Sequence, residues 1–139
     1  MDVAQLRALI FGLADQAEGG EHAWHFVYRG VQMACMTDSG FGRMRIVAPI
    51  IEASELRPDH MYAMLDANYH SALDVRYAIS DGMVMAAFIH PLVPLDEEQV
   101  RAAVRQVASA VQTFGGSYSS GELVFGPGRS TGNGNGNPN

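Results

Sequence analysis

The dipeptide Asp81-Gly82 lies between two stretches with strand character, and this arrangement constrains the fold more than any other feature of the sequence. The stretch before it, LDVRYAIS at residues 73–80, alternates strictly in side-chain character, and MVMAAFIH at residues 83–90 follows it. An Asp-Gly pair favours a two-residue turn because both central residues of that turn need positive φ values. We therefore predict an antiparallel β-hairpin at this position.

Three further strands are predicted before this hairpin. In HAWHFVYR the large aromatic side chains alternate with His25, Val27 and Arg29, which indicates a half-buried strand. Tight turns are expected at Arg29-Gly30 and within DSGFG, because glycine accepts the backbone conformations that such turns need. The three predicted strands are HAWHFVYR at residues 22–29, VQMACMT at residues 31–37 and RMRIVAPI at residues 43–50.

Two helices are predicted from turn and capping signals on either side of these strands. Asp2 is a good N-cap for a first helix over about residues 3–18, and Gly19-Gly20 is expected to end it. Pro58 suits the first position of a second helix.

The last helix has the most specific start signal in the chain. Asp96 and Gln99 have the spacing of a capping box, and Glu97 and Glu98 suit the positive end of the helix dipole. We expect this helix to begin after Asp96. Its apolar stripe is Val100, Val104, Val107, Val111 and Phe114, and Gly115-Gly116 is expected to end it.

The predicted elements follow the order α-β-β-β-α-β-β-α. This order favours an α+β protein with a mostly antiparallel five-stranded sheet and helices packed on one face. We expect a single domain over residues 1–125 and a flexible Gly/Asn-rich tail over residues 126–139, because that composition cannot bury a core. The stretch GELVFG, where the two meet, fits either a short docked segment or the start of the tail.

The charged residues narrow the choice of partner and of chemistry. The net charge is −6, whereas phosphate binding favours a basic surface, so nucleic acid is not expected as the main partner. All 9 basic residues are arginine. The absence of lysine excludes reactions through a lysine Schiff base and phosphate loops that depend on a lysine.

The apolar residues and the single cysteine favour a cytoplasmic location. No apolar run approaches the ~18 residues that a membrane-spanning helix needs, and the N-terminus lacks the basic region of a signal peptide. Cys35 is the only cysteine, so no internal disulfide is possible, in agreement with a reducing compartment. A lone cysteine in an apolar strand is most often a small buried hydrophobe.

The element order and several local sequences resemble type III secretion chaperones and the related YbjN-like proteins. RMRIVAPI resembles the third strand of the family, with its terminal small-Pro-hydrophobic step. The stretch from LDANYHSALDV to LDEEQVRAAVRQV is similar to the second half, where an Asn-Tyr pair ends a helix and a Leu-Asp-Glu-Glu step opens the last one. The resemblance covers about residues 3–116. It implies a cytoplasmic, often dimeric, peptide-binding chaperone or regulator without cofactors, and it implies no catalytic residues.

Motifs for catalysis or metal binding are not found in the sequence. His22 and His25 are three residues apart, which in a strand puts them on opposite faces and makes them poor joint ligands. No nucleophile elbow, HExxH sequence or paired-cysteine motif occurs. The glycines at residues 126–136 follow no predicted strand and open no helix, unlike a phosphate-binding loop. We therefore expect no enzymatic activity, no metal and no cofactor.

One face of the predicted sheet combines arginine with apolar side chains. With the aromatic and aliphatic sets turned to the helices, four of the arginines fall on the opposite face. An arginine fork binds a carboxylate through two hydrogen bonds, and its stem tolerates apolar neighbours. Such a face suits a peptide with acidic and hydrophobic residues or a second subunit, and the alternative is a solvated face whose arginines pair with nearby acids. The candidate peptide-binding residues are Arg29, Arg43, Arg45, Arg76, Val84 and Phe88.

These features favour a non-enzymatic, chaperone-like module that binds another polypeptide and forms a homodimer. Two other classes stay open. The chain fits a small-ligand sensor or enzyme with a pocket between sheet and helices, which convergent polar groups would indicate. It also fits an assembly subunit whose sheet face serves only self-association.

Overall fold

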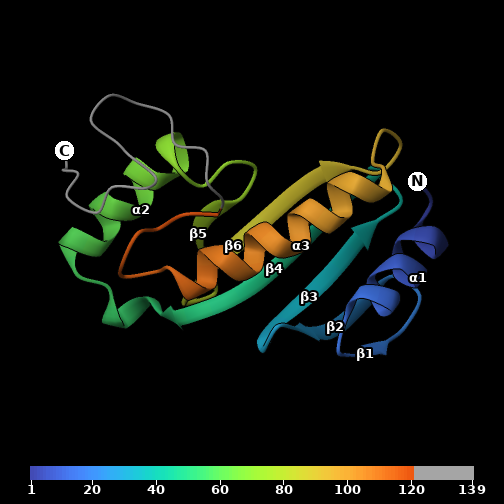
Figure 1. Cartoon of the computed structure of the whole chain (residues 1–139), viewed down its shortest axis with the longest axis horizontal. Helices are drawn as coiled ribbons and strands as arrows, with labels where there is room; N and C mark the ends of the chain where they lie inside the picture. The colour runs from blue at the N-terminus through green and yellow to red at the C-terminus, as the bar shows by residue number, and fades with distance from the viewer. Residues whose placement is uncertain (121–139) are drawn as a thin grey trace.

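The structure, a computed structural model, describes residues 1–120, which form an α+β fold built on one antiparallel sheet (Figure 1). The sheet has six strands in the order β1-β2-β3-β4-β6-β5. The predicted tail at 126–139 and the whole stretch GELVFG lie outside the described residues. The elements are α1 (Val3–Leu13), β1 (Gln16–Gly19), β2 (Ala23–Tyr28), β3 (Val31–Asp38), β4 (Arg43–Glu52), a 3-10 turn (Ala53–Glu55), α2 (Pro58–His70), β5 (Arg76–Ser80), β6 (Met83–Pro91) and α3 (Glu97–Gln112).

The predicted fold class is confirmed, but the prediction of five strands is wrong by one. Residues 16–19, predicted as the end of the first helix, form strand β1, in which Ala17 pairs with Phe26 of β2. Gly19 has a φ of 139°, and a β-carbon there would lie only 2.6 Å from the Cα atom of Trp24. This glycine therefore closes the turn between β1 and β2, and pairing of residues 16–19 with β2 outweighs their helix preference.

All three predicted turns are present: residues 39–42 of DSGFG join β3 to β4, and the other two are two-residue turns. Asp81 and Gly82 have φ values of 50° and 78°, and Arg29 and Gly30 have values of 51° and 80°. Positive φ at both central residues characterises the type I′ turn, whose twist matches that of the flanking strands. The two turns fix the register of each hairpin, and the register decides which side chains face the core.

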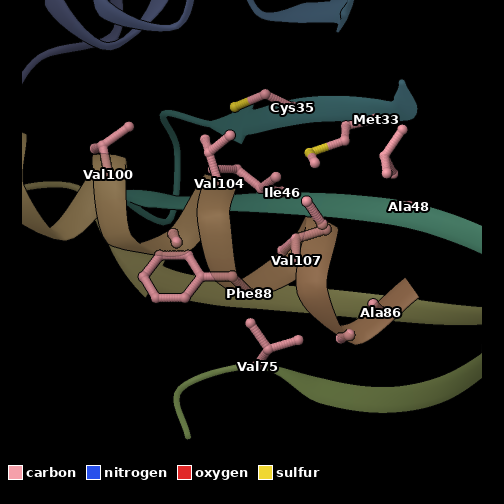
Figure 2. Close-up of a cluster of buried hydrophobic side chains, with 14 of the residues drawn as sticks. Met33, Cys35, Ile46, Ala48, Val75, Ala86, Phe88, Val100, Val104 and Val107 are labelled. Atoms are coloured by element: carbon pink, nitrogen blue, oxygen red, sulfur yellow. The ribbon is translucent and has the colours of Figure 1, made fainter. Parts of the chain in front are cut away.

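Helix α3 packs across the sheet over β4 and β6 (Figure 1). It begins as predicted: the Asp96 carboxylate accepts a hydrogen bond from the N–H of Gln99 at 2.8 Å, and the Gln99 side chain accepts one from the N–H of Asp96 at 3.0 Å. Burying a valine side chain contributes about 1.5–3 kcal/mol, so a stripe of them holds the helix on the sheet. The buried valines are Val100, Val104 and Val107, which Figure 2 shows among side chains of the sheet.

Helix α2 contacts β5, at the end of the sheet opposite to α1 (Figure 1). The Asn68 carboxamide donates to the C=O of Tyr77 at 3.1 Å and accepts from its N–H at 2.8 Å. Asn68 thus takes the position of a neighbouring strand and closes part of this edge. Strand β5 begins at Arg76, later than the predicted start at Leu73, because Leu73 has a φ of 53° and turns the chain.

Candidate functional site

Successive side chains of strand β4 point to opposite faces of the sheet, and only one of these faces is buried. Met44 and Ile46 are buried on the side of α3, whereas Arg43 and Arg45 are exposed. The same alternation on neighbouring strands defines a second face, which we name the open face. Its members are all exposed or half-buried: Ala23, His25, Val27, Gln32, Ala34, Met36, Arg43, Arg45, Val47, Pro49, Arg76, Ala78, Met85, Ala87 and Ile89.

Arg43 and Arg45 lie on the same side of β4, two residues apart. The strand register places Arg45 between Met36 of β3 and Ile89 of β6. Both of these apolar side chains are exposed, Met36 to 39% and Ile89 to 48%. Directly opposed side chains on neighbouring strands are about 5 Å apart at their β-carbons, so Arg45 is flanked by apolar surface.

In residues 1–120, neither guanidinium is within ion-pair distance of a carboxylate. Asp38 lies opposite Arg43 in the register, but its carboxylate accepts a hydrogen bond from the N–H of Phe41 at 3.2 Å. The two arginines are therefore available to an outside partner. The ion pairs that the structure does form with arginine join Arg57 to Asp59 at 3.0 Å and Arg101 to Glu97 at 3.6 Å.

Val84 and Phe88, predicted to share this face, lie on the opposite one. Val84 is 0% exposed and Phe88 is 5% exposed, and Phe88 pairs with the buried Ile46. Figure 2 shows Phe88 within the cluster that also contains the valines of α3. The prediction is wrong because both alternating sets of β6 are apolar, so the sequence of this strand does not distinguish the two faces. Met85 and Ile89 occupy the open face instead.

The other two predicted arginines have local roles. The Arg76 guanidinium donates to two C=O groups of the preceding turn, at 2.6 and 2.8 Å, so it is engaged within its own segment. Arg29 lies in the turn between β2 and β3, with its guanidinium 5.0 Å from the centre of the Tyr28 ring. That turn is at the other end of β3 from Arg43, about 20 Å away at ~3.3 Å per strand residue. The structure therefore brings together only Arg43 and Arg45 of the four.

A groove of about 680 Å³ crosses the open face from β1 to β6. Two small side chains on the central strands, Ala34 and Val47, line its middle. Its end at β1 and β2 is polar, with Glu18 and His25, and its end at β6 is apolar, with Met85. The β1 side of this groove was not predicted, because residues 16–19 have the pattern of a helix end. Further lining residues on this face are Gln16, Val27, Gln32 and Pro49.

A smaller cleft of about 360 Å³ lies between β6 and the first half of α3. Polar side chains line it, including Asp74, His90 and Glu98. Asp74 already exchanges two hydrogen bonds with Gln106, at 3.1 and 3.2 Å. Between α3 and the sheet, apolar side chains fill the space that Figure 2 shows. The polar side chains that the small-ligand alternative would need therefore lie in this smaller cleft at the start of α3, and not in the apolar layer between α3 and the centre of the sheet.

Three further features bear on the chemistry that this chain can support. Cys35 is 0% exposed in β3, and burial raises the pKa of its thiol to about 12. Within residues 1–120, no three His, Cys, Asp or Glu side chains are grouped to hold a metal ion. No helix in the same part of the chain has the length and apolar character to cross a membrane.

Comparison with known proteins finds similarity at the level of the fold. No family model matches the sequence, and no curated protein matches it. One chain of the HopA1–SchA chaperone–effector complex has 9% identity and a TM-score of 0.58, with 82% of this chain and 97% of that chain covered. One chain of the ExsC–ExsE complex has 14% identity, a TM-score of 0.59 and the same coverage. The expected chaperone-like fold is confirmed, and the resemblance to YbjN-like proteins stays a prediction.

Proposed function

We propose that this chain is a non-enzymatic, chaperone-like module of the cytoplasm that binds another polypeptide through the open face of its sheet. The fold shared with chains of chaperone–effector complexes supports this class. Because one fold serves many functions, the chemistry of the face has to carry the choice. The deciding observation is the pair Arg43 and Arg45, which are available to an outside partner and lie next to the exposed Met36 and Ile89.

An acidic and apolar segment matches this chemistry. Each guanidinium can hold a carboxylate through two parallel hydrogen bonds, while its stem lies on apolar neighbours. Exposed methionine side chains adapt their shape to different apolar partners. Since the protein carries a net charge of −6, two arginines that have no acidic partner within residues 1–120 form a local field of opposite sign. Such a field guides acidic segments to this face and away from the rest of the surface.

The alternative of a solvated face requires these arginines to be neutralised by acids of the same chain. In the part of the chain that the structure describes, the ion pairs of arginine involve Arg57 and Arg101, which lie at helices and not on the open face. Exposed Met36 and Ile89 give such a face no benefit in water. Binding therefore accounts for more of the face than solvation does.

We further propose a homodimer that forms through helix α2. Met61, Leu65 and Tyr69 recur at one helical turn, with Tyr62 beside them, and their exposed fractions are 48%, 70%, 77% and 76%. An apolar stripe of this size on one helix marks an interaction site. A two-fold axis places the same stripe of a second copy against it, so that the apolar stripes of both subunits are buried in one interface.

The double substitution Arg43→Glu with Arg45→Glu tests the proposed binding face. Both side chains are exposed, so we expect the melting temperature to stay within about a few degrees of wild type. The variant should no longer capture the polypeptides that tagged wild-type protein captures from its host lysate, as identified by mass spectrometry. Increasing salt should weaken capture by the wild type, because the contact is electrostatic and exposed.

The matched control is Arg101→Glu with Arg105→Glu on helix α3, which changes the net charge by the same amount away from the open face. This control should keep the same partners. If the Arg43 and Arg45 variant captures them equally well, the open face is not the binding site. If it instead loses stability, the two arginines serve the fold.

A further inference from the structure

The groove on the open face is lined mainly by strands whose backbone groups are already paired. Strands β2, β3, β4 and β6 each have a neighbouring strand on both sides. Their N–H and C=O groups lie in the plane of the sheet and bond to those neighbours. The middle of the groove therefore offers side chains, and not backbone groups, to a bound polypeptide.

This restricts the conformation of the bound segment. A segment that lies extended in the groove would bury N–H and C=O groups against side chains that cannot satisfy all of them, which is unfavourable. A helix satisfies these groups within itself and presents an apolar stripe on one side. Addition of a strand requires a free sheet edge, and the middle of the groove, at β3 and β4, has none. The edges are β1 and β5, and on β5 the Asn68 carboxamide already bonds to the N–H and C=O of Tyr77.

The dimensions of the groove fit a short helix. It spans the five adjacent strands from β1 to β6, which at ~4.8 Å per strand gives roughly 19 Å. A helix of about 13 residues has this length at ~1.5 Å per residue. Ala34 and Val47 leave room in the middle of the groove. On the same face, the longer Met36 follows Ala34 by two residues, and the longer Arg45 precedes Val47 by two.

The positions of the two arginines distinguish one flank of a bound helix from the other. Arg45 and then Arg43 extend from one side of the groove, and neither has an acidic partner in residues 1–120. Carboxylates along one flank of a bound helix would pair with them. We propose that the groove binds an amphipathic helix of a partner protein, with its apolar stripe on Ala34, Val47 and Met85 and its acidic flank toward the two arginines. This rests on the proposed function and specifies the conformation and charge pattern of the ligand.

Two peptide display libraries of equal size, screened against the full-length chain, test the proposal. One library fixes a helical scaffold of about 14 residues with apolar positions at i, i+3, i+4 and i+7. The other has the same composition in a scaffold locked in the extended conformation. We expect binders from the helical library, with acidic residues selected on one flank. Their affinity should fall about tenfold or more in Arg43→Glu with Arg45→Glu.

A steric variant locates the bound helix. Ala34→Phe should fill the middle of the groove and weaken binding to a similar extent, whereas Ser80→Phe, an exposed residue of β5 outside the groove lining, should not. Melting temperatures check that each variant is folded. Binders found only in the extended library would overturn the helical conformation and leave the proposed function standing. Helical binders that tolerate Ala34→Phe would overturn the groove as their site. The absence of binders from both libraries would overturn the proposed function as well.

Discussion

At the scale of single residues, Cys35 shows how burial decides chemistry. The sequence predicts a small buried hydrophobe at this position, and the structure confirms that the side chain is 0% exposed. Burial raises the pKa of its thiol to about 12, because the thiolate would lose its hydration without gaining a partner. Since the thiolate is the reactive form, this cysteine should react slowly with thiol reagents while the protein is folded.

The same pKa predicts that stability falls at alkaline pH. In the unfolded chain the thiol titrates near its ordinary pKa of about 8.5, whereas in the folded chain its pKa is about 12. Between these values the unfolded state has lost a proton that the native state keeps, so the free energy of unfolding decreases as pH rises. The slope reaches at most about 1.4 kcal/mol per pH unit for one group. Below pH ~8.5 the contribution is fully present.

Urea unfolding between pH 8 and pH 11 measures this slope, and Cys35→Ala is the comparison. The variant should be less stable overall because it leaves a cavity, yet its stability should fall less steeply with pH than that of the wild type. Burial also raises the pKa of Tyr77, to about 12, so both proteins keep the part of the slope that Tyr77 contributes. Equal slopes in the two proteins would mean that the thiol does not titrate differently on folding.

Residue positions in the sheet were predictable where the two faces of a strand differ in chemistry. In β4 the arginines alternate with Met44 and Ile46, and the structure places the two sets on opposite faces as predicted. In β6 both sets are apolar, so Phe88 could not be assigned from its own strand. Its face is fixed by pairing with β4, a contact between residues far apart in the sequence.

At the scale of elements, the ends of helices were predictable where a local hydrogen bond fixes them. Helix α3 begins after Asp96 because that carboxylate bonds to the N–H of Gln99 at 2.8 Å. Helix α1 has an equivalent start, since Asp2 accepts from the N–H of Gln5 at 2.8 Å. Its end was predicted too late, because residues 16–19 pair with β2, and the Gly19-Gly20 pair that closes this hairpin fits a helix end equally well. The polar end of the groove, which β1 forms, was missed for the same reason.

The cap of α3 gives a prediction about stability alone. Asp96→Ala removes the hydrogen bond to the Gln99 N–H and should lower the free energy of unfolding by roughly 0.5–2 kcal/mol. Glu98→Ala, an exposed acid in the same first turn without the capping bond, is the control and should cost less than ~1 kcal/mol. Urea unfolding measures both. Capture of partners should be unchanged, because Asp96 is not part of the open face, and a wild-type unfolding curve for Asp96→Ala would contradict the role of the cap.

At the scale of the whole molecule, the two proposed surfaces belong to different parts of the fold. The groove extends from β1 to β6, whereas α2 lies next to β5 at the end of the sheet (Figure 1). Dimer formation through α2 would therefore leave the groove of each subunit free. A dimer with two grooves can hold two segments of one partner at once. Binding of the first segment raises the effective concentration of the second, so the dimer binds such a partner more tightly than a single groove does.

Substitutions that introduce charge into the α2 stripe test the proposed dimer. Leu65→Glu with Tyr69→Glu places carboxylates on two side chains that are 70% and 77% exposed, so the subunit should stay folded while the dimer dissociates. Light scattering coupled to gel filtration measures the mass, and circular dichroism checks the fold. Phe41→Glu with Val93→Glu, at side chains 83% and 87% exposed elsewhere, is the matched control and should remain dimeric. A wild type that is monomeric at every concentration would contradict the dimer. A dimer that survives the α2 variant but dissociates with Arg43→Glu and Arg45→Glu would instead place self-association on the open face.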